Sequence, residues 1–113
     1  MSATQRIRLC AADALPVGGM RRFDVAGRAV ALYHLEDGFY ATDAICSHAQ
    51  AVLTDGQLRG GRVVCPLHGA RFDVRSGRVL SPPAFRPLRT YPVQVEDGAV
   101  FVEIPAPVGS LRG

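Results

Sequence analysis

The feature that most constrains this chain is a pair of short segments that each hold a cysteine close to a histidine. Cys46 and His48 follow the pattern C-x-H, and Cys65 and His68 follow C-x2-H, with 16 residues between the two segments. They include two of the three cysteines and two of the three histidines of the chain. Thiolates and imidazoles together suit zinc or iron–sulfur chemistry. A fold for this sequence therefore has to present two short metal-binding loops.

Three interpretations of these segments can be compared. A single cysteine or histidine is usually a packed or surface residue, but two such pairs at short spacing indicate a metal site. Zinc sites of two cysteines and two histidines usually pair like with like, whereas each segment here mixes the two residue types. The mixed arrangement is that of Rieske [2Fe–2S] centres, in which two thiolates bind one iron and two imidazoles bind the other.

The hydrophobic pattern predicts an all-β domain. Short runs alternate between apolar and polar residues, and no run keeps the helical period over three turns. Ala26-Gly27 and Asp97-Gly98 are typical of tight hairpin turns, since glycine adopts a positive φ without steric cost. The expected strands are 5–11, 20–25, 28–35, 39–42, 89–96 and 99–104, and residues 10–16 are expected to form one helical turn at most.

Length and composition exclude several classes of protein. A chain of 113 residues is long enough for one domain, 1–113. No apolar run is long enough to span a membrane, and the N-terminal region lacks the apolar stretch of a signal peptide. The odd number of cysteines argues against a secreted disulfide framework. We therefore expect a cytoplasmic protein with reduced thiols.

The charge pattern leaves two interpretations open. The formal net charge is +3, and all 13 basic residues are arginine. This indicates either a basic surface that steers an acidic partner or only a general preference for arginine over lysine. No compact basic run interleaved with aromatic residues occurs, so we expect no nucleic acid among the partners.

The two segments and the sequence after them resemble a known family. The stretches "CSH", "CPLHGARFD", "SPP" and "PLRTYPVQVEDG" are similar to those of the Rieske ferredoxins of bacterial aromatic-ring-hydroxylating dioxygenase systems. The resemblance runs from about Arg6 to Ile104. It implies an all-β Rieske fold, in which a cluster-binding subdomain, about 44–83, is inserted into an antiparallel β base. We expect residues 105–113 to form a loose tail.

The resemblance also implies one [2Fe–2S] cluster per chain, with a role for each ligand. Cys46 and Cys65 correspond to the ligands of the inner iron, and His48 and His68 to those of the outer iron near solvent. The loop at residues 81–83 corresponds to one that covers the cluster from a third side.

Departures from a related branch predict a low reduction potential. Rieske proteins of respiratory complexes have two further cysteines that join the loops, and Ala51 and Leu67 occupy those positions here. They also have a serine and a tyrosine that donate hydrogen bonds to the cluster, where this chain has Ala70 and Phe72. Fewer donors leave the reduced cluster less stabilised.

The function implied by the resemblance is single-electron transfer. The chain would accept an electron from a flavin-dependent ferredoxin reductase and deliver it to a terminal Rieske oxygenase, through a tip around Ala49, Gln50 and Leu67. It would itself be no enzyme, because only His34 remains and a 2-His-1-carboxylate iron site cannot be assembled. One alternative is a Rieske-like small subunit of another reductase, such as nitrite reductase. The other is a zinc-stapled binding module.

Residues outside the two segments are expected to be structural. Cys10 is interpreted as a buried thiol, and His34 as a surface or strand-edge residue. Gly69 is expected to allow close approach of the backbone to the cluster. The aromatic residues are expected to pack in the core or across strands; they are Tyr33, Phe39, Tyr40, Phe72, Tyr91 and Phe101.

Overall fold

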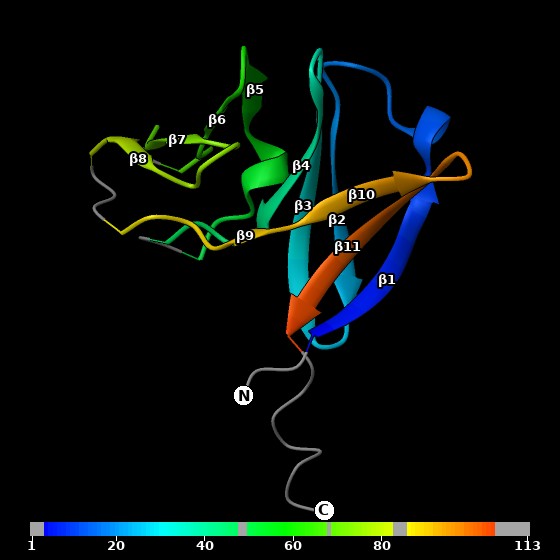
Figure 1. Ribbon diagram of the computed structural model, residues 1–113. Helices are drawn as coiled ribbons and strands as arrows, with labels where there is room; N and C mark the ends of the chain where they lie inside the picture. Colours follow the sequence, from blue (N-terminus) through cyan, green and yellow to red (C-terminus); the bar gives the residue numbers. More distant parts are fainter. Residues whose placement is uncertain (1–3, 48–49, 68, 83–85, 106–113) are drawn as a thin grey trace, which may run out of the picture.

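The computed structural model describes residues 4–47, 50–67, 69–82 and 86–105. They form short antiparallel strands in two parts that lie side by side (Figure 1). The strands are β1 (Thr4–Ala11), β2 (Met20–Val25), β3 (Arg28–Leu35), β4 (Gly38–Asp43), β5 (Gln57–Arg59), β6 (Arg62–Val64), β7 (Arg71–Asp73), β8 (Val79–Ser81), β9 (Thr90–Tyr91), β10 (Val93–Glu96) and β11 (Ala99–Pro105). Two 3₁₀ turns cover Ala12–Ala14 and Leu53–Asp55. Among these residues no helix is long and apolar enough to cross a membrane.

The first part, the base, is built from two sheets. One has the strand order β1-β11-β10 and the other β2-β3-β4-β9. Their facing sides share one core, which consists of Cys10, Leu15, Val30, Leu32, Ala41, Tyr91, Val100, Val102 and Ile104. The two sheets therefore shield each other's apolar faces, as in a sandwich.

The second part is inserted between β4 and β9, at residues 44–89. We call this segment the insert. It forms a third sheet with the order β5-β6-β7-β8, in which each strand is three residues long. The chain returns beside the point where it left, because Ala41 pairs with Tyr91 and Thr42 with Thr90. The amide of Asp43 also donates to the carbonyl of Arg89 at 2.9 Å.

Strand β3 joins the two parts because both of its faces are buried. Val30 and Leu32 point into the core of the base. Ala31, Tyr33 and Leu35 belong to a second core shared with the insert, which adds Ala44, Cys46, Leu53, Val63, Cys65, Ala70, Phe72, Val74 and Leu88. The Tyr33 hydroxyl is hydrogen-bonded to Thr42 Oγ1 at 2.9 Å, and burial raises the Tyr33 pKa.

Both predicted hairpin turns are confirmed. Ala26 and Gly27 have φ values of 49° and 78°, and Asp97 and Gly98 have values of 52° and 74°. Two consecutive residues with positive φ are the mark of a type I′ turn, whose twist matches that of the strands it joins. These turns place β2 beside β3 and β10 beside β11.

The single strand expected at 89–96 differs from the structure. Thr90–Tyr91 pairs with β4 in one sheet, whereas Val93–Glu96 pairs with β11 in the other. Pro92 lies between them and has no amide hydrogen to continue a ladder. The proline therefore marks the place where the chain crosses from one sheet to the next.

Cys10 is buried in the base core, as expected. Simple alternation would place it on the exposed side with Arg6 and Arg8. A register shift between Arg8 and Cys10 adds one residue to β1, and the alternation changes side at this point.

The expectation for His34 is wrong. Strand β3 lies between β2 and β4, so His34 is not on an edge strand, and its side chain is half-buried. Its Nδ1 is 2.6 Å from the carbonyl oxygen of Leu15, and its ring stacks on Phe39 with centroids 3.8 Å apart. Because a carbonyl can only accept, Nδ1 carries the proton. The tail expected beyond Pro105 lies outside the described residues.

Alanine substitution at Gly77 and at Gly98 compares a glycine packed against the end of the insert with one that has open space around it. Both have left-handed φ values, 77° and 74°. A Cβ at Gly77 would lie 2.2 Å from the Leu88 carbonyl oxygen, whereas one at Gly98 would meet nothing within 4 Å. Gly98→Ala should cost about 1–2 kcal/mol of unfolding free energy from its backbone conformation alone. Gly77→Ala should cost more, because the segment 86–89 has to move. Denaturant unfolding of both variants tests this, and equal losses would contradict it.

Candidate metal centre

Two loops of the insert begin at buried cysteines. Cys46 lies three residues after β4, and Cys65 directly follows β6. Their exposed fractions are 4% and 1%, and both belong to the same packed cluster of side chains. The structure therefore brings together the two thiols that the sequence pattern selects. His48, His68 and Ala49 lie outside the described residues.

Each of the two loops is closed by a hydrogen bond of the same kind. The amide of Cys46 donates to the carbonyl of Ala51 at 2.8 Å, and the amide of Cys65 donates to the carbonyl of Ala70 at 2.8 Å. In each loop the acceptor lies five residues after the cysteine. Each loop is thus a closed unit that starts at a thiol, and each carries one of the predicted histidines between its ends.

The second loop contains a further constraint at Gly69. Its amide donates to the carbonyl of Cys65 at 3.1 Å, and its φ is 75°. A side chain would be strained in this left-handed conformation, which is sufficient reason for glycine here. At the loop tips Leu67 is 53% exposed and Gln50 is also exposed.

The side chains around the thiols are apolar. Ala70, Phe72 and Leu53 have no exposed surface and pack in the cluster that holds Cys46 and Cys65. A pair of buried thiolates in such a shell fits an iron–sulfur group, which takes cysteine sulfur as ligand, better than it fits a hard cation, which takes oxygen.

Two hydrogen bonds fix the loops from their flanks. Ser47 Oγ donates to the carbonyl of Arg86 at 2.7 Å, which ties the first loop to the last part of the insert. Ser81 Oγ accepts the amide of Arg71 at 3.2 Å, directly after the second loop. Ser81 begins the expected covering loop, but Pro83 lies outside the described residues.

The remaining cysteine and histidine are excluded from this centre. Cys10 belongs to the core of the base, and burial raises the pKa of its thiol, which disfavours the thiolate needed for metal binding. His34 is engaged with Leu15 and Phe39. The described part of the chain therefore offers no second cysteine–histidine site around these residues.

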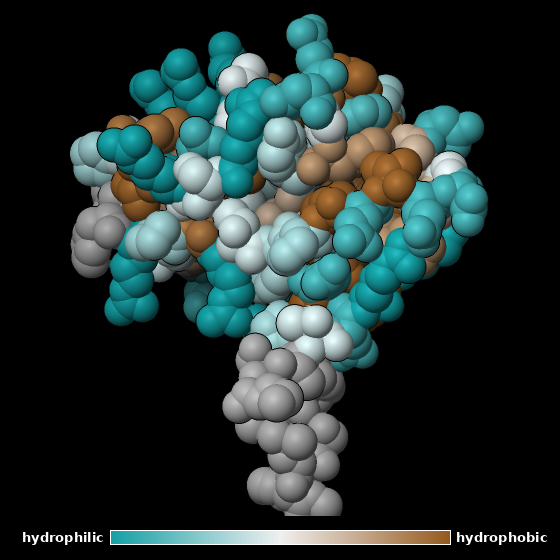
Figure 2. Space-filling view, viewed as in Figure 1, coloured by the Kyte–Doolittle hydropathy of each residue, from teal (hydrophilic) through white to brown (hydrophobic). Residues whose placement is uncertain are grey.

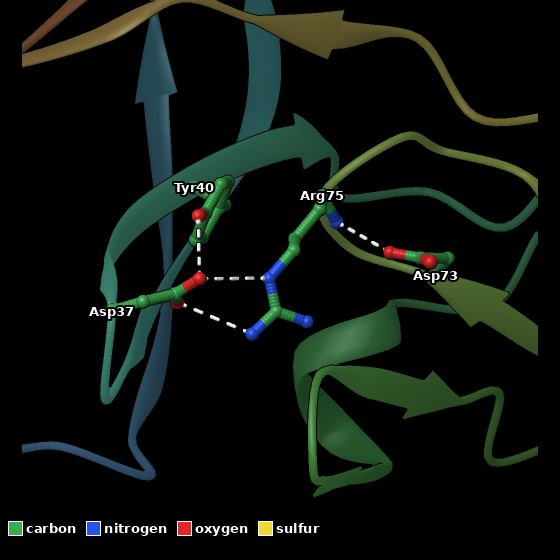
Figure 3. Close-up of polar contacts among 4 residues, drawn as sticks. All are labelled: Asp37, Tyr40, Asp73 and Arg75. Atoms are coloured by element: carbon green, nitrogen blue, oxygen red, sulfur yellow. Dashed lines mark hydrogen bonds and ion pairs between the residues drawn. The ribbon is translucent and has the colours of Figure 1, made fainter.

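A polar clamp links the insert to the base at the turn between β3 and β4 (Figure 3). Arg75 donates to both carboxylate oxygens of Asp37 at 3.2 Å, and the Tyr40 hydroxyl donates to Asp37 at 3.1 Å. The Arg75 amide donates to Asp73 at 2.8 Å. The hydrogen bond from Arg75 lowers the pKa of the Asp37 carboxyl.

A second polar group lies where the insert leaves β4. The Tyr91 hydroxyl donates a short hydrogen bond to Asp43, and Arg28 donates to the Tyr91 oxygen at 3.3 Å. Burial, together with Asp43, raises the Tyr91 pKa. Tyr91 therefore joins the entry and exit strands of the insert through its side chain as well as through its backbone.

Comparison with protein-family models matches residues 5–92 to the Rieske [2Fe-2S] domain. The chain belongs to the Rieske [2Fe–2S] family. The ferredoxin component of the p-cumate 2,3-dioxygenase system of Pseudomonas putida is 43% identical over 105 residues, which cover 91% of this chain and 89% of that protein. The cofactor of the present chain is thus a Rieske-type [2Fe–2S] cluster rather than a single zinc ion.

Solved structures support the same family. One structure is the complex of reduced oxygenase and oxidized ferredoxin in carbazole 1,9a-dioxygenase, and a chain in it is 38% identical. The match covers 86% of this chain and 91% of that chain, with a TM-score of 0.82. A protein of Mycobacterium tuberculosis described as the small subunit of an NADH-dependent nitrite reductase is 27% identical, with a TM-score of 0.76 and coverage of 93% and 99%. The all-β Rieske fold expected from the sequence is confirmed.

Sequence reasoning missed the contacts that hold this Rieske insert in place. Asp37 and Arg75 are 38 residues apart in the sequence, and Ser47 and Arg86 are 39 apart. Neither pair is signalled by periodicity or motif, because both depend on how the insert folds back on the base. Within the loops, only the two cysteines, the two histidines and Gly69 could be selected from the sequence.

The clamp predicts a dependence of stability on pH. The folded-state pKa of Asp37 is lowered from 3.8, so the ionised carboxylate favours the folded protein. This contribution is fully present above the unfolded value and is lost as the pH falls through the folded value. The advantage of the natural protein over Asp37→Asn should therefore be largest near neutral pH and shrink as the pH falls below 3.8. Unfolding of both proteins, followed from neutral pH down to the point at which the cluster spectrum is lost, measures it. An advantage that grows on acidification would contradict the clamp.

Proposed function

We propose that this chain is the ferredoxin of an aromatic-ring-hydroxylating dioxygenase system. It accepts single electrons from a flavin-dependent ferredoxin reductase and passes them to a terminal Rieske oxygenase. The observation that carries the proposal is the likeness to dioxygenase ferredoxin components over nearly the full length of both chains. The lower identity to the nitrite reductase small subunit makes that role the second candidate. We propose that the protein works in the cytoplasm, where its thiols stay reduced.

We further propose that Cys46 and Cys65 hold the inner iron and that His48 and His68 hold the outer iron. The burial of both thiols, in one cluster and at equivalent places in two loops, supports the first half. The position of each histidine within the same closed loop supports the second half. The bound cluster supplies one-electron chemistry, cycling between an oxidised and a reduced state.

The residues of this chain set the conditions for that chemistry. The apolar shell excludes water from the thiolates, and the loop hydrogen bonds hold their positions. The amides of Cys46, Cys65 and Gly69 donate to carbonyls of their own loops. They are therefore not directed at the cluster, and Ala70 and Phe72 have no hydroxyl to offer. All of these features favour a low potential.

The chain acts as a carrier and makes no bonds in a substrate. Its exposed tip at Gln50 and Leu67 is suited to a transient complex, because electron carriers use small interfaces and release quickly. His34 is the remaining histidine, and its engagement with Leu15 leaves it unsuited to an oxygen-activating iron site. The choice of aromatic substrate belongs to the oxygenase.

The cofactor can be tested by analysis of the purified protein. It should be reddish brown and contain about two irons and two acid-labile sulfides per chain. Metal analysis and sulfide assay measure both. One zinc per chain without labile sulfide would support the zinc-stapled module instead.

The ligand assignment can be tested by substitution. His48→Ala, His68→Ala, Cys46→Ser and Cys65→Ser should each abolish the Rieske absorption and electron paramagnetic resonance spectra, since each removes one ligand. Cys10→Ala is the control and should leave both spectra intact, because Cys10 lies in the other core. Loss of the spectra in this control would show that the thiols are wrongly assigned.

The reduction potential tests the roles of Ala70 and Phe72. Rieske centres range from about −150 to +300 mV, and we expect this one below about 0 mV. If a hydroxyl donor stabilises the reduced cluster by about 1–2 kcal/mol more than the oxidised one, it raises the potential by about 40–90 mV. Ala70→Ser and Phe72→Tyr should therefore each raise it, provided that the hydroxyl reaches a sulfur.

Potentiometric titration of these variants needs one matched control. Phe23→Tyr adds the same hydroxyl to a half-buried phenylalanine that packs against the base core, and it should leave the potential unchanged. A natural potential near the top of the Rieske range would mean that other residues control it.

A further inference from the structure

The positive charge of this chain is concentrated in the insert. Residues 44–89 contain seven arginines and two carboxylates, a formal charge of +5. The rest of the chain contains six arginines and eight carboxylates, a formal charge of −2. A general preference for arginine over lysine does not produce this division, because it would not remove acidic residues from one part. Formal charge is therefore unevenly distributed, with the positive excess on the insert that carries the two cysteine loops.

Three of these arginines lie on the outer face of the inserted sheet. Arg59 on β5 is directly opposite Arg62 on β6, and Arg71 on β7 is opposite Val64 on β6. All three arginines are exposed, whereas Leu58, Val63 and Phe72 on the alternate positions point inward. We call Arg59, Arg62 and Arg71 the arginine face.

The arginine face is shallowly hollowed. It borders a hollow of about 430 Å³, lined by Gln57, Arg59, Arg62, Val64 and Arg71. Figure 2 shows hydrophilic residues over much of the side that carries β5–β8, with a few apolar residues among them.

The positive charge on this face is only partly neutralised within the described part of the chain. The ion pairs among the described residues join Arg6 to Glu96, Arg22 to Asp24 and Arg75 to Asp37. None of them involves an arginine of this face. Asp73 lies directly opposite Arg62 on the same face, and its carboxylate also accepts the amide of Arg75, so three arginines and one carboxylate leave a formal charge of +2 there. Like charges directly opposite each other destabilise a sheet, so Arg59 and Arg62 lower the stability of the free protein. An external acidic group over the face would offset this repulsion.

The arginine face is continuous with the second cluster loop. Val64 directly precedes Cys65, and Arg71 directly follows Ala70, so the two ends of the loop are anchored on the face. The exposed Leu67 lies at the tip of the same loop. A protein that covers the tip would therefore lie beside the three guanidinium groups.

We propose that the arginine face docks a carboxylate-rich patch on the redox protein that exchanges electrons with this chain. The proposal rests on the proposed function and names the chemistry of the partner. Guanidinium groups bind carboxylates in paired hydrogen bonds, which orient the complex as well as attract it. A protein is favoured over a nucleic acid because the face has no exposed aromatic platform among its lining residues and is only three strand residues wide.

The test uses cluster-loaded protein and two redox proteins of opposite charge. Reduced flavodoxin is the acidic electron donor, and cytochrome c is the basic electron acceptor. Stopped-flow rates are measured at ionic strengths of about 0.01 M and about 0.15 M, where the Debye length is about 30 and 8 Å. The flavodoxin rate should fall with salt, and the cytochrome c rate should rise.

The variant Arg59→Gln/Arg62→Gln/Arg71→Gln removes the arginine face. At low salt it should slow the flavodoxin reaction about tenfold or more and remove most of its salt dependence. It should also speed the reaction with cytochrome c. The matched control is Arg8→Gln/Arg21→Gln/Arg22→Gln, which makes the same change in net charge at three exposed positions of the base. The control should keep the natural rates.

The outcomes separate the docking face from the proposed function. Equal slowing in both triple variants would mean that only net charge acts, and it would overturn the docking face. Tight binding of a labelled DNA duplex at about 0.15 M salt, lost in the first variant, would also overturn it. Failure of the natural protein to exchange electrons with either redox protein would instead overturn the carrier function. If the triple variant does not load its cluster, Arg59→Gln and Arg62→Gln singly should each give part of the effect.

Discussion

The burial of β3 on both faces is the interaction on which the rest of this structure depends. A strand in a sandwich normally presents one apolar face, but β3 directs Val30 and Leu32 to one core and Ala31, Tyr33 and Leu35 to another. The two cores are therefore separated by one sheet, in which β3 is the strand buried on both faces. Polar substitution on either face would disturb one core and, through the strand itself, the other. The near-continuous apolar run of β3 in the sequence follows from this position.

The insert cannot be understood apart from that strand. Its sheet has strands of three residues, which are too short to be stable alone. Side chains of β3 complete its core, pairing of β4 with β9 closes its ends, and the Asp37–Arg75 clamp holds its far side. This exposed clamp contributes little by itself, since surface ion pairs are weak. It gives the insert a second attachment to the base, at the turn between β3 and β4. A stable base thus allows the insert to consist largely of loops and functional residues.

Local features could be predicted from the sequence, and features that depend on long-range pairing could not. The turns at Ala26-Gly27 and Asp97-Gly98 are set by two adjacent residues, and the metal loops by a short motif. The change of sheet at Pro92 and the bulge before Cys10 depend on which strand lies alongside. His34 shows the same limit, because its partner Leu15 is 19 residues away in the sequence. The assignment of the four ligands rests on the motif and the family, and it stays a prediction for Cys46, His48, Cys65 and His68.

The hydrogen bonds that hold the loops also bear on the potential of the cluster. The amides of Cys46 and Cys65 close their loops onto Ala51 and Ala70, and the amide of Gly69 turns back to Cys65. Each of these donors would otherwise be free to stabilise extra electron density on a nearby sulfur. We therefore expect these three amides to give the reduced cluster of the proposed site little stabilisation. With the proposed cluster in place, these three hydrogen bonds serve to hold the loops, and a hydroxyl at Ala70, where the second loop closes, or at Phe72 in β7 would be a donor that the natural chain lacks.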